Sequence, residues 1–290
     1  MNARAYLFVP GDAPRKMEKA AQGPADAIIL DLEDSVSPDA KDAALDLTCA
    51  FLRAAGETAS ARYWVRLNAT EPARALRELV ALPLGRIAGL VVPKLSSLDR
   101  LAPLAHALDA LEARDGLPAG AVGLIGIVTE TAAALLAGAD LGRGHPRLRG
   151  YCWGIEDLSA DIGRAQHGQA PQAAERLSRL AQEFCLMVAT AAGIDAIDGV
   201  DTRIEAVDAI AADARLAADL GFRGKLAIHP AQIAPLQAAF TPDADSLAWA
   251  RRVLALAQDS GASAFRLDGR MIDRPHIEAA RRLLARARPA

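Results

Sequence analysis

Short, almost wholly apolar runs recur along the chain, separated by stretches with apolar residues at three- and four-residue spacing. Runs with so few polar positions are typical of parallel strands buried on both faces. The intervening spacing is typical of amphipathic helices, for example over Leu98–Ala113 and Ala173–Ala191. We predict eight strands, namely Ala5–Val9, Ala27–Leu32, Tyr63–Leu67, Gly89–Val92, Gly123–Val128, Gly150–Ile155, Ala196–Val200 and Lys225–Ile228.

This alternation predicts an α/β protein, and eight repeated units favour a closed (β/α)8 TIM barrel. An open doubly wound sheet is the structural alternative. After the eighth predicted strand the pattern changes to two helix-like stretches, Asp245–Gln258 and Arg274–Ala287, with a glycine-containing segment between them. We therefore expect a barrel over residues 1–240 and a C-terminal helical extension and lid over residues 241–290.

Composition narrows the classes of partner and location. The net charge of −3 gives no reason to expect a nucleic acid or a membrane as partner. The 3 cysteines lack the spacing of a zinc site or a disulfide framework. No apolar run approaches the roughly 18 residues of a membrane span, and no charged-then-apolar leader begins the chain. We therefore expect a cytoplasmic protein.

Acidic residues follow the predicted strands at the end where barrel enzymes build their active sites. Glu33 and Asp34 follow the second strand, Glu130 the fifth and Asp157 the sixth. Because the fifth and sixth strands are neighbours in a barrel, Glu130 and Asp157 could share one ion. Mg²⁺ usually takes one or two carboxylates and completes its shell with water and substrate oxygens. The alternative is that each acid caps the helix that follows it.

Arg66 stands at the end of a strongly apolar strand. An arginine in such a place is costly unless it is paired, and its planar fork matches a carboxylate through two hydrogen bonds. The structural alternative is an ion pair with Glu33 or Asp34 on the neighbouring strand. The two interpretations are compatible, because such a pair would hold the guanidinium ready for an anionic substrate.

Several short motifs stand at the ends of the predicted strands and in the tail. They are Leu7-Phe8-Val9-Pro10-Gly11, Ile29-Leu30-Asp31-Leu32-Glu33-Asp34, Val65-Arg66-Leu67-Asn68, Val92-Pro93-Lys94, Glu130-Thr131, Gly154-Ile155-Glu156-Asp157, Ala227-Ile228-His229-Pro230 and Leu267-Asp268-Gly269-Arg270-Met271-Ile272-Asp273. In this order, from about residue 4 to residue 280, the set resembles the citrate lyase β-subunit-like family of the HpcH/HpaI aldolase/citrate lyase superfamily. That family includes citryl-CoA, malyl-CoA and citramalyl-CoA lyases.

The resemblance implies a Mg²⁺-dependent (β/α)8 barrel that acts on short β-hydroxy-acyl-CoA thioesters, usually as a homotrimer or larger homo-oligomer. It implies that Glu130 and Asp157 are the metal ligands and that Arg66 contacts the oxo-acid part of the substrate. Arg15 and Lys19 fall where the family contacts the CoA phosphates. The alternative for these two is the ordinary solvated face of the first helix.

Three further residues are substrate or catalytic candidates by the same resemblance. Pro93 and His229 are expected to contact the substrate, and a neutral structural histidine is the alternative for His229. Asp273 matches an aspartate of a lid-like C-terminal element that reaches a neighbouring subunit's site. Its alternative is a cap on the last helix, because an aspartate just before Arg274-Pro275 is a common helix start.

These expectations combine into a reversible Claisen-type cleavage that yields a 2-oxo acid and acetyl-CoA. Mg²⁺ would act as a Lewis acid, Arg66 would stabilise negative charge, and Asp273 would transfer a proton to the enolate carbon. Either Glu33 or a hydroxide on the metal would remove the hydroxyl proton. The alternative functions are an acyl-CoA thioesterase on the same site, an aldolase for free 2-oxo acids, and a non-catalytic subunit that binds a CoA thioester. Both a stand-alone enzyme and a partner of other citrate lyase subunits fit the sequence.

Overall fold

A closed barrel of parallel strands forms the centre of the computed structural model, which describes residues 3–56, 62–164, 171–260 and 264–287. Within these residues each strand is hydrogen-bonded to the next in the sequence, and β8 returns to β1. The closure confirms the predicted barrel and excludes the open sheet. The strands are β1 (Ala5–Pro10), β2 (Ala27–Asp31), β3 (Tyr63–Arg66), β4 (Gly89–Val92), β5 (Gly123–Ile127), β6 (Leu148–Cys152), β7 (Asp195–Asp198) and β8 (Gly224–Ala227).

The sixth strand departs most from its predicted range, Gly150–Ile155. It begins at Leu148 and ends at Cys152, whereas the apolar run continues to Ile155. The apolar residues beyond Cys152 lie in the loop that follows the strand. There Trp153 is buried, and its Nε1 donates to Asp198 Oδ1 at 2.7 Å.

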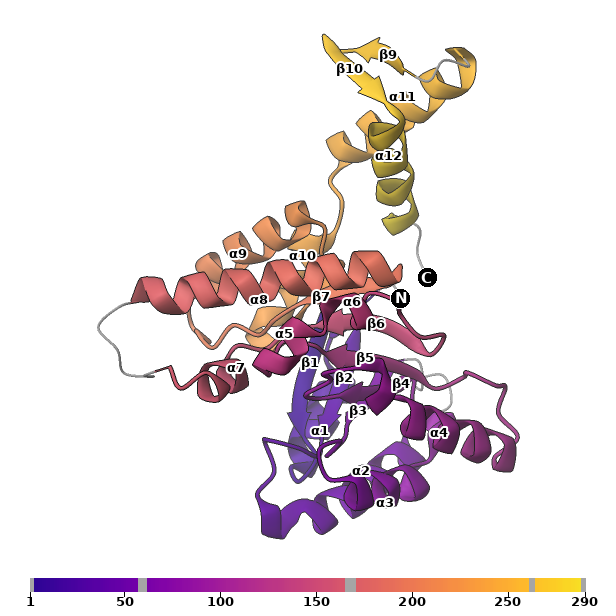
Figure 1. The fold of residues 1–290 in the computed structure, drawn as a ribbon, viewed down its shortest axis with the longest axis vertical. Helices are drawn as coiled ribbons and strands as arrows, with labels where there is room; N and C mark the ends of the chain where they lie inside the picture. Colours follow the sequence, from indigo (N-terminus) through magenta and orange to yellow (C-terminus); the bar gives the residue numbers. More distant parts are fainter. Residues whose placement is uncertain (1–2, 57–61, 165–170, 261–263, 288–290) are drawn as a thin grey trace.

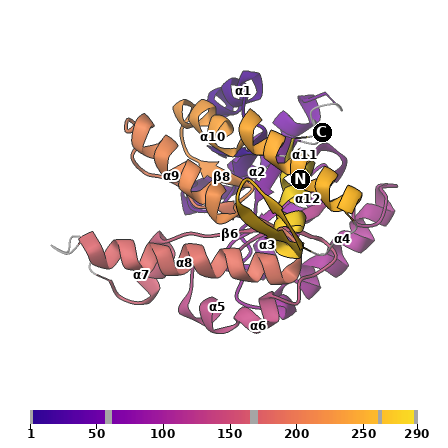
Figure 2. The ribbon, with the colours of Figure 1, turned by 90° about the horizontal axis from the view of Figure 1, so that it is seen from above.

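Helices surround the barrel, as Figure 1 and the view from above in Figure 2 show. The predicted helix over Leu98–Ala113 is a short 3-10 turn (Leu98–Arg100) followed by an α-helix. The α-helices are α1 (Pro14–Gln22), α2 (Lys41–Ala54), α3 (Pro72–Ala81), α4 (Ala102–Arg114), α5 (Ala132–Leu136), α6 (Gly138–Leu141), α7 (Glu156–Asp161), α8 (Pro171–Ala192), α9 (Val207–Leu220) and α10 (Ile233–Phe240).

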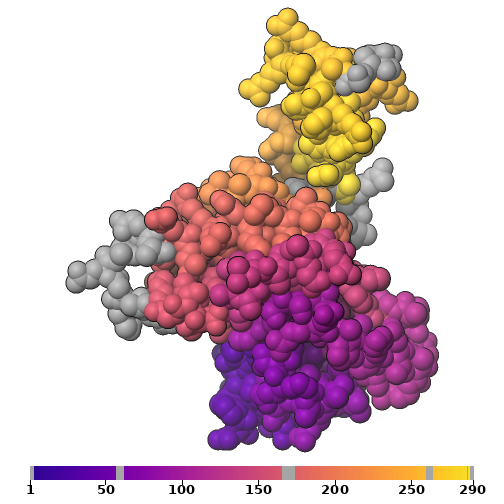
Figure 3. All heavy atoms as spheres, viewed as in Figure 1, coloured from indigo at the N-terminus to yellow at the C-terminus, as the bar shows by residue number. Residues whose placement is uncertain are grey.

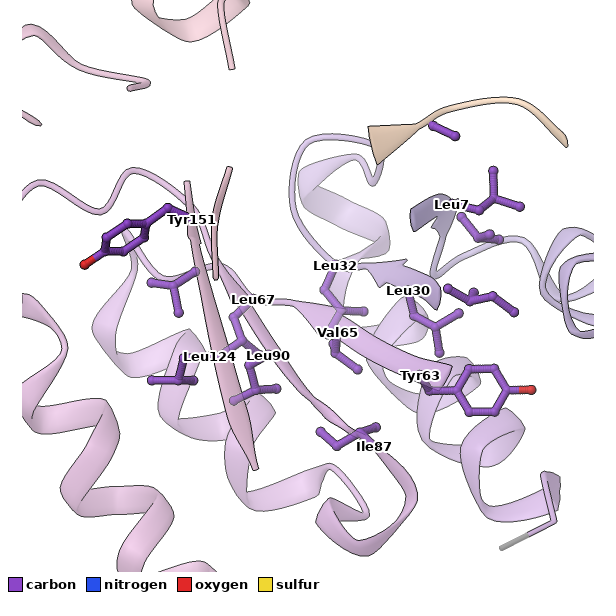
Figure 4. Close-up of a cluster of buried hydrophobic side chains, with 14 of the residues drawn as sticks. Leu7, Leu30, Leu32, Tyr63, Val65, Leu67, Ile87, Leu90, Leu124 and Tyr151 are labelled. Atoms are coloured by element: carbon purple, nitrogen blue, oxygen red, sulfur yellow. The ribbon is translucent and has the colours of Figure 1, made fainter. Parts of the chain in front are cut away.

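Two apolar layers explain why the strands are almost wholly apolar. On β2, Ile28 and Leu30 belong to the large core between the strands and the helices, whereas Ile29 belongs to the cluster inside the barrel. Figure 4 shows part of the large core, including Leu30 and Val65. Because successive side chains of a strand point to opposite faces, both alternating sets must be apolar.

A separate small lobe follows the barrel. It consists of α11 (Ala244–Ser260), β9 (Ala264–Leu267), β10 (Arg270–Asp273) and α12 (Arg274–Arg286). It projects away from the barrel, in yellow in Figures 1 and 3, and has its own core built around Val253, Leu267 and Ile272. We refer to these elements as the tail lobe. Its two helices confirm the predicted ones.

The antiparallel hairpin of β9 and β10 in the tail lobe was not predicted. Its turn is Asp268-Gly269, and both residues have positive φ, 47° and 81°. Two such residues form the tight turn that matches the twist of a hairpin, and Asp-Gly is a strong signal for it. The signal was present in the sequence.

The tail lobe leaves the barrel at the N-terminal ends of the strands. Thr241 follows α10, and its Oγ1 accepts a hydrogen bond of 2.8 Å from Arg4 Nη1, one residue before β1. Gln237 lies on α10, and its Nε2 donates at 2.7 Å to the carbonyl of Pro24, which precedes β2. The connection therefore lies at the end of the barrel opposite to the loops that carry the predicted site.

Two expectations from composition can be compared with the structure. Cys49, Cys152 and Cys185 are all buried, and each is a free cysteine in the structure. None of the helices in the described ranges has both the length and the apolarity needed to cross a membrane.

Candidate active site

Arg66 lies at the C-terminal end of β3 and is held by carboxylates from the end of β2. Its Nε and Nη2 donate to Asp31 Oδ1 and Oδ2, both at 2.7 Å, and its guanidinium carbon lies 4.9 Å from the centroid of the Phe8 ring. Burial raises the pKa of Asp31, but the hydrogen bonds and charge of Arg66 outweigh it and hold that pKa below its ordinary value. The expected partners Glu33 and Asp34 also approach Nη1, at 3.1 and 3.6 Å.

Lys94 connects Arg66 and its carboxylate partners to the predicted metal ligands. It follows β4 with φ of 51°, in the left-handed region that residues other than glycine seldom adopt. Its Nζ lies 3.0 Å from Glu33 Oε1 and 2.9 Å from Asp157 Oδ2, and its backbone N–H donates to Glu130 Oε2 at 2.6 Å. Polar side chains from the ends of five neighbouring strands, β2 to β6, are thus joined in one network.

Sequence reasoning had assigned no role to Lys94 or Asp31. Both stand at the end of a buried apolar strand, where a charged group needs a partner. The same argument, applied above to Arg66, predicts charged partners for Lys94 and Asp31 as well.

Glu130 is a buried carboxylate, 5% exposed. Burial raises its pKa to about 8; the Glu33 and Asp157 carboxylates contribute to the rise, whereas the N–H and charge of Lys94 oppose it. Thr131 is the residue that caps α5, through an Oγ1 that accepts from the Ala134 N–H at 3.2 Å. Helix capping is therefore the wrong explanation for Glu130.

Asp157 lies in the first turn of α7, where the helix dipole favours an acid. The N-cap position is Ile155, however, and the Asp157 carboxylate turns to Lys94. Its side chain is 35% exposed, far more than that of Glu33 at 7%. Asp157 is thus more accessible to an incoming ion than Glu33 or Glu130.

Glu130 and Asp157 together suit a hard divalent cation. Gly154 stands beside the Glu130 carboxyl group, since a Cβ there would lie 3.4 Å from Cγ and 3.6 Å from Oε1. The glycine thereby keeps one side of that carboxyl group open. The described parts of the chain hold no group of three or more His, Cys, Asp or Glu side chains that could bind a metal. A site of two carboxylates that leaves the remaining positions to water and substrate is the usual one for Mg²⁺.

The other predicted contacts lie around this network. Arg15 and Lys19 are exposed, one turn apart on α1. Pro93 is buried and lines a cavity of about 260 Å³ beside α3 and α4. His229 is exposed, and its Nδ1 accepts from the Ala231 N–H at 3.2 Å, so it caps the short 3-10 helix that follows it. This is the structural role considered for His229.

Asp273 is not brought to the site of its own chain. It ends β10 and begins α12 as the N-cap residue, with Oδ1 2.5 Å from His276 Nδ1. The tail lobe leaves the barrel at the N-terminal ends of the strands, whereas Arg66 and Glu130 lie at the C-terminal ends. A catalytic role for Asp273 therefore requires a second copy of the chain.

Known families and structures match the whole chain. A family model described as HpcH/HpaI aldolase/citrate lyase matches residues 4–230, and one described as C-C bond lyase of the TIM-barrel fold matches residues 174–289. A citrate lyase subunit beta-like protein from Mycobacterium tuberculosis is 35% identical over 293 residues, which cover 99% of this chain and 98% of that relative. A (3S)-malyl-CoA thioesterase from Cereibacter sphaeroides is 31% identical, over 98% of this chain and 94% of that relative.

A solved structure provides a further comparison. It is the crystal structure of the CitE protein from Mycobacterium tuberculosis in complex with magnesium, acetoacetate and coenzyme A. The TM-score is 0.76 at 32% sequence identity, and the match covers 98% of both chains.

Proposed function

The chain belongs to the HpcH/HpaI aldolase/citrate lyase family, and we propose that it is a Mg²⁺-dependent carbon–carbon lyase for a short β-hydroxy-acyl-CoA. The products would be a 2-oxo acid and acetyl-CoA, as from citryl-CoA, malyl-CoA or citramalyl-CoA. The observation that carries the proposal is the continuous network from Arg66 through Glu33 and Lys94 to Asp157. This network supports a site in which the guanidinium of Arg66 binds an anion close to the proposed metal ligands, Glu130 and Asp157. The magnesium- and coenzyme A-bound relative supports the same metal and substrate class.

Glu130 and Asp157 would hold the Mg²⁺, which when bound acts as a Lewis acid on the substrate oxygens. Arg66 binds the carboxylate of the oxo-acid part. A guanidinium has five N–H donors, and Asp31 takes only two of them. Of the remaining donors, Nη1 lies 3.1 Å from Glu33 and 3.6 Å from Asp34, and we propose that these donors bind the substrate carboxylate.

Glu33 is the group that we propose removes the hydroxyl proton of the substrate. Its Oε1 is held by Lys94, and its buried Oε2 has no hydrogen-bond donor in good geometry, although Arg66 Nη1 lies 3.1 Å away. Loss of that proton allows the carbon–carbon bond to break, which leaves the 2-oxo acid and the enolate of acetyl-CoA. Asp273 of a neighbouring copy then transfers a proton to the enolate carbon.

We further propose that residues 1–240 act as the barrel and residues 241–290 as a lid over the site of the next copy in a homotrimer or larger homo-oligomer. The exit of the tail lobe at the N-terminal ends of the strands supports this arrangement. Arg15 and Lys19 would bind the CoA phosphates, and Pro93 would border the acyl-CoA. For His229, the ring nitrogen Nε2 is the atom left for a substrate contact.

An acyl-CoA thioesterase on the same site is the second candidate, favoured by the (3S)-malyl-CoA thioesterase relative. Malyl-CoA distinguishes the two reactions. With Mg²⁺, a lyase releases glyoxylate and acetyl-CoA, whereas a thioesterase releases malate and free CoA thiol. We expect glyoxylate without an equal amount of free thiol. Stoichiometric thiol and malate from the wild-type protein, absent with Glu130→Gln, would assign hydrolysis instead.

A further inference from the structure

The charges around Lys94 are unevenly balanced. Three carboxylates, Glu33, Glu130 and Asp157, face its ammonium and backbone N–H, and we call them the carboxylate cluster. A second cation, Arg66, forms a two-pronged pair with Asp31 and also lies 3.1 Å from Glu33. Carboxylates brought together away from water repel one another. Of these two cations, only the ammonium of Lys94 is paired with Asp157.

The backbone at Lys94 indicates that this arrangement is maintained at a cost. With φ of 51° it lies in a region that glycine adopts freely and other residues adopt under strain. Such strain persists where surrounding contacts enforce it, and it concentrates at functional sites. Here the left-handed turn directs the N–H of Lys94 to Glu130 and its side chain to Glu33 and Asp157. A glycine would relieve the strain but could supply only the first contact.

The two carboxylates bound by the ammonium differ in freedom. Glu33 is 7% exposed and also lies 3.1 Å from Arg66, so it has a second cation nearby. Asp157 is 35% exposed and lies in a helix of only 6 residues. An incoming cation that binds Glu130 and Asp157 would compete with Lys94 for Asp157 and leave the Lys94–Glu33 pair intact.

We propose that Lys94 is a positioning residue whose ammonium serves as the internal counter-ion of the carboxylate cluster and gives up Asp157 to a divalent cation. The inference rests on the proposed function, because it takes Glu130 and Asp157 as the ligands. Lys94 then sets how tightly the site binds the cation. It stabilises the metal-free protein, and it weakens cation binding because two positive charges compete for one carboxylate.

Lys94→Met tests the proposal, since methionine keeps an unbranched side chain of similar size and removes the charge. Lys16→Met is the matched control, because it removes one charge from an exposed position of α1. Isothermal titration with Mg²⁺ measures the dissociation constant, and thermal unfolding in EDTA and in saturating Mg²⁺ measures stability. We expect Lys94→Met to bind Mg²⁺ at least about tenfold more tightly. Its melting temperature should be lower in EDTA and rise further on adding Mg²⁺, whereas Lys16→Met should behave as the wild type.

A folded Lys94→Met protein that binds Mg²⁺ with unchanged or weaker affinity overturns the proposal and leaves the proposed function standing. A wild-type protein that binds no Mg²⁺ overturns both. If Lys94→Met does not fold, reductive methylation of the wild-type lysines, quantified by mass spectrometry, replaces it. Lys94 should then be labelled faster with Mg²⁺ than in EDTA, whereas Lys225, buried and paired with Asp198 at 2.5 Å, should not change. Labelling of Lys94 that ignores Mg²⁺ overturns the proposal.

Discussion

Asp31 and Arg66 occupy paired positions at the ends of β2 and β3 and are joined by two parallel hydrogen bonds of 2.7 Å. The Asp31 side chain is 2% exposed and that of Arg66 is 12% exposed. A fork matched in this way fixes the plane of the guanidinium as well as its position. The strand register therefore determines how the arginine presents its remaining donors to a substrate.

Asp31→Asn should weaken both the fold and the reaction. It removes the charge opposite a buried guanidinium, and breaking a buried ion pair from one side costs about 3 kcal/mol of unfolding free energy. Urea unfolding measures this loss, and kcat/KM for the acyl-CoA should fall with it. Asp42→Asn is the control, since it breaks the exposed pair with Arg74 and should leave both quantities nearly unchanged. Equal effects of the two substitutions would contradict a special role for the buried pair.

Removal of the metal should abolish turnover. We expect EDTA to stop acyl-CoA cleavage and added Mg²⁺ to restore it. Glu130→Gln should lose measurable Mg²⁺ binding in a calorimetric titration, because an amide oxygen is a much weaker ligand than a carboxylate. The amide oxygen can still accept the Lys94 N–H, so the variant should remain folded. Wild-type Mg²⁺ affinity in this variant would be incompatible with Glu130 as a ligand.

Asp273→Asn should lower kcat by about 10²- to 10⁴-fold without loss of folding or Mg²⁺ binding. Asparagine is as good an N-cap as aspartate, so α12 should keep its start. Steady-state kinetics with circular dichroism as the folding check measures the effect. A normal kcat would leave Asp273 only its helix-capping role.

Complementation tests whether Asp273 acts on a neighbouring copy. Arg66→Ala and Asp273→Asn should each be nearly inactive alone. When they are unfolded together and reassembled, mixed oligomers should contain sites with an intact Arg66 from one copy and an intact Asp273 from the next. Recovery of activity in the mixture is the expected result. A mixture as inactive as its components would place both residues in the site of a single chain.

Acid stability should depend on Glu112 at the opposite end of the barrel. Its carboxylate receives Arg147 Nη1 and Nη2 at 2.8 and 2.7 Å, and the N–H groups of Gly120 and Val122 at 2.9 and 2.8 Å. Burial alone would raise the pKa of Glu112, but these donors outweigh it and lower the pKa from 4.5 to about 2.

A carboxylate whose pKa is lowered by folding stabilises the protein fully above its unfolded value and loses that effect as the pH falls. The unfolding free energy should therefore decrease between pH 4.5 and about 2. Glu112→Gln should be less stable at neutral pH and should show a shallower decrease over the same range. Denaturant titrations at several pH values measure both curves, and parallel curves would rule out Glu112 as a source of the acid dependence.

Much of the fold was predictable because both faces of each strand are buried. Ile28, Ile29 and Leu30 are all apolar for that reason, and the resulting runs mark β2 unmistakably. The end of β6 was harder to predict, since Trp153 continues the apolar run into a loop where it packs against Asp198. Burial produces the same pattern in a loop as in a strand.

The structure brings together Arg66, Glu33, Glu130 and Asp157, which the sequence predicts for the site, but Lys94 and Asp31, which connect them, were not predicted. Strand order alone placed Glu130 and Asp157 at neighbouring ends. The contacts that join them to Arg66 depend on the side-chain directions of Lys94 and Asp31, and a linear pattern does not contain these. The direction in which the chain leaves α10 is likewise a tertiary property, and it decides that Asp273 lies far from its own barrel site.

Because the tail lobe leaves the barrel at the N-terminal ends of the strands, we expect activity to depend on protein concentration. The barrel and the tail lobe each bury a core within one chain, so a separated copy would keep its fold. Under the proposed function its site would nevertheless lack Asp273. Activity per chain would then follow mass action and fall as the protein is diluted, with no change in secondary structure.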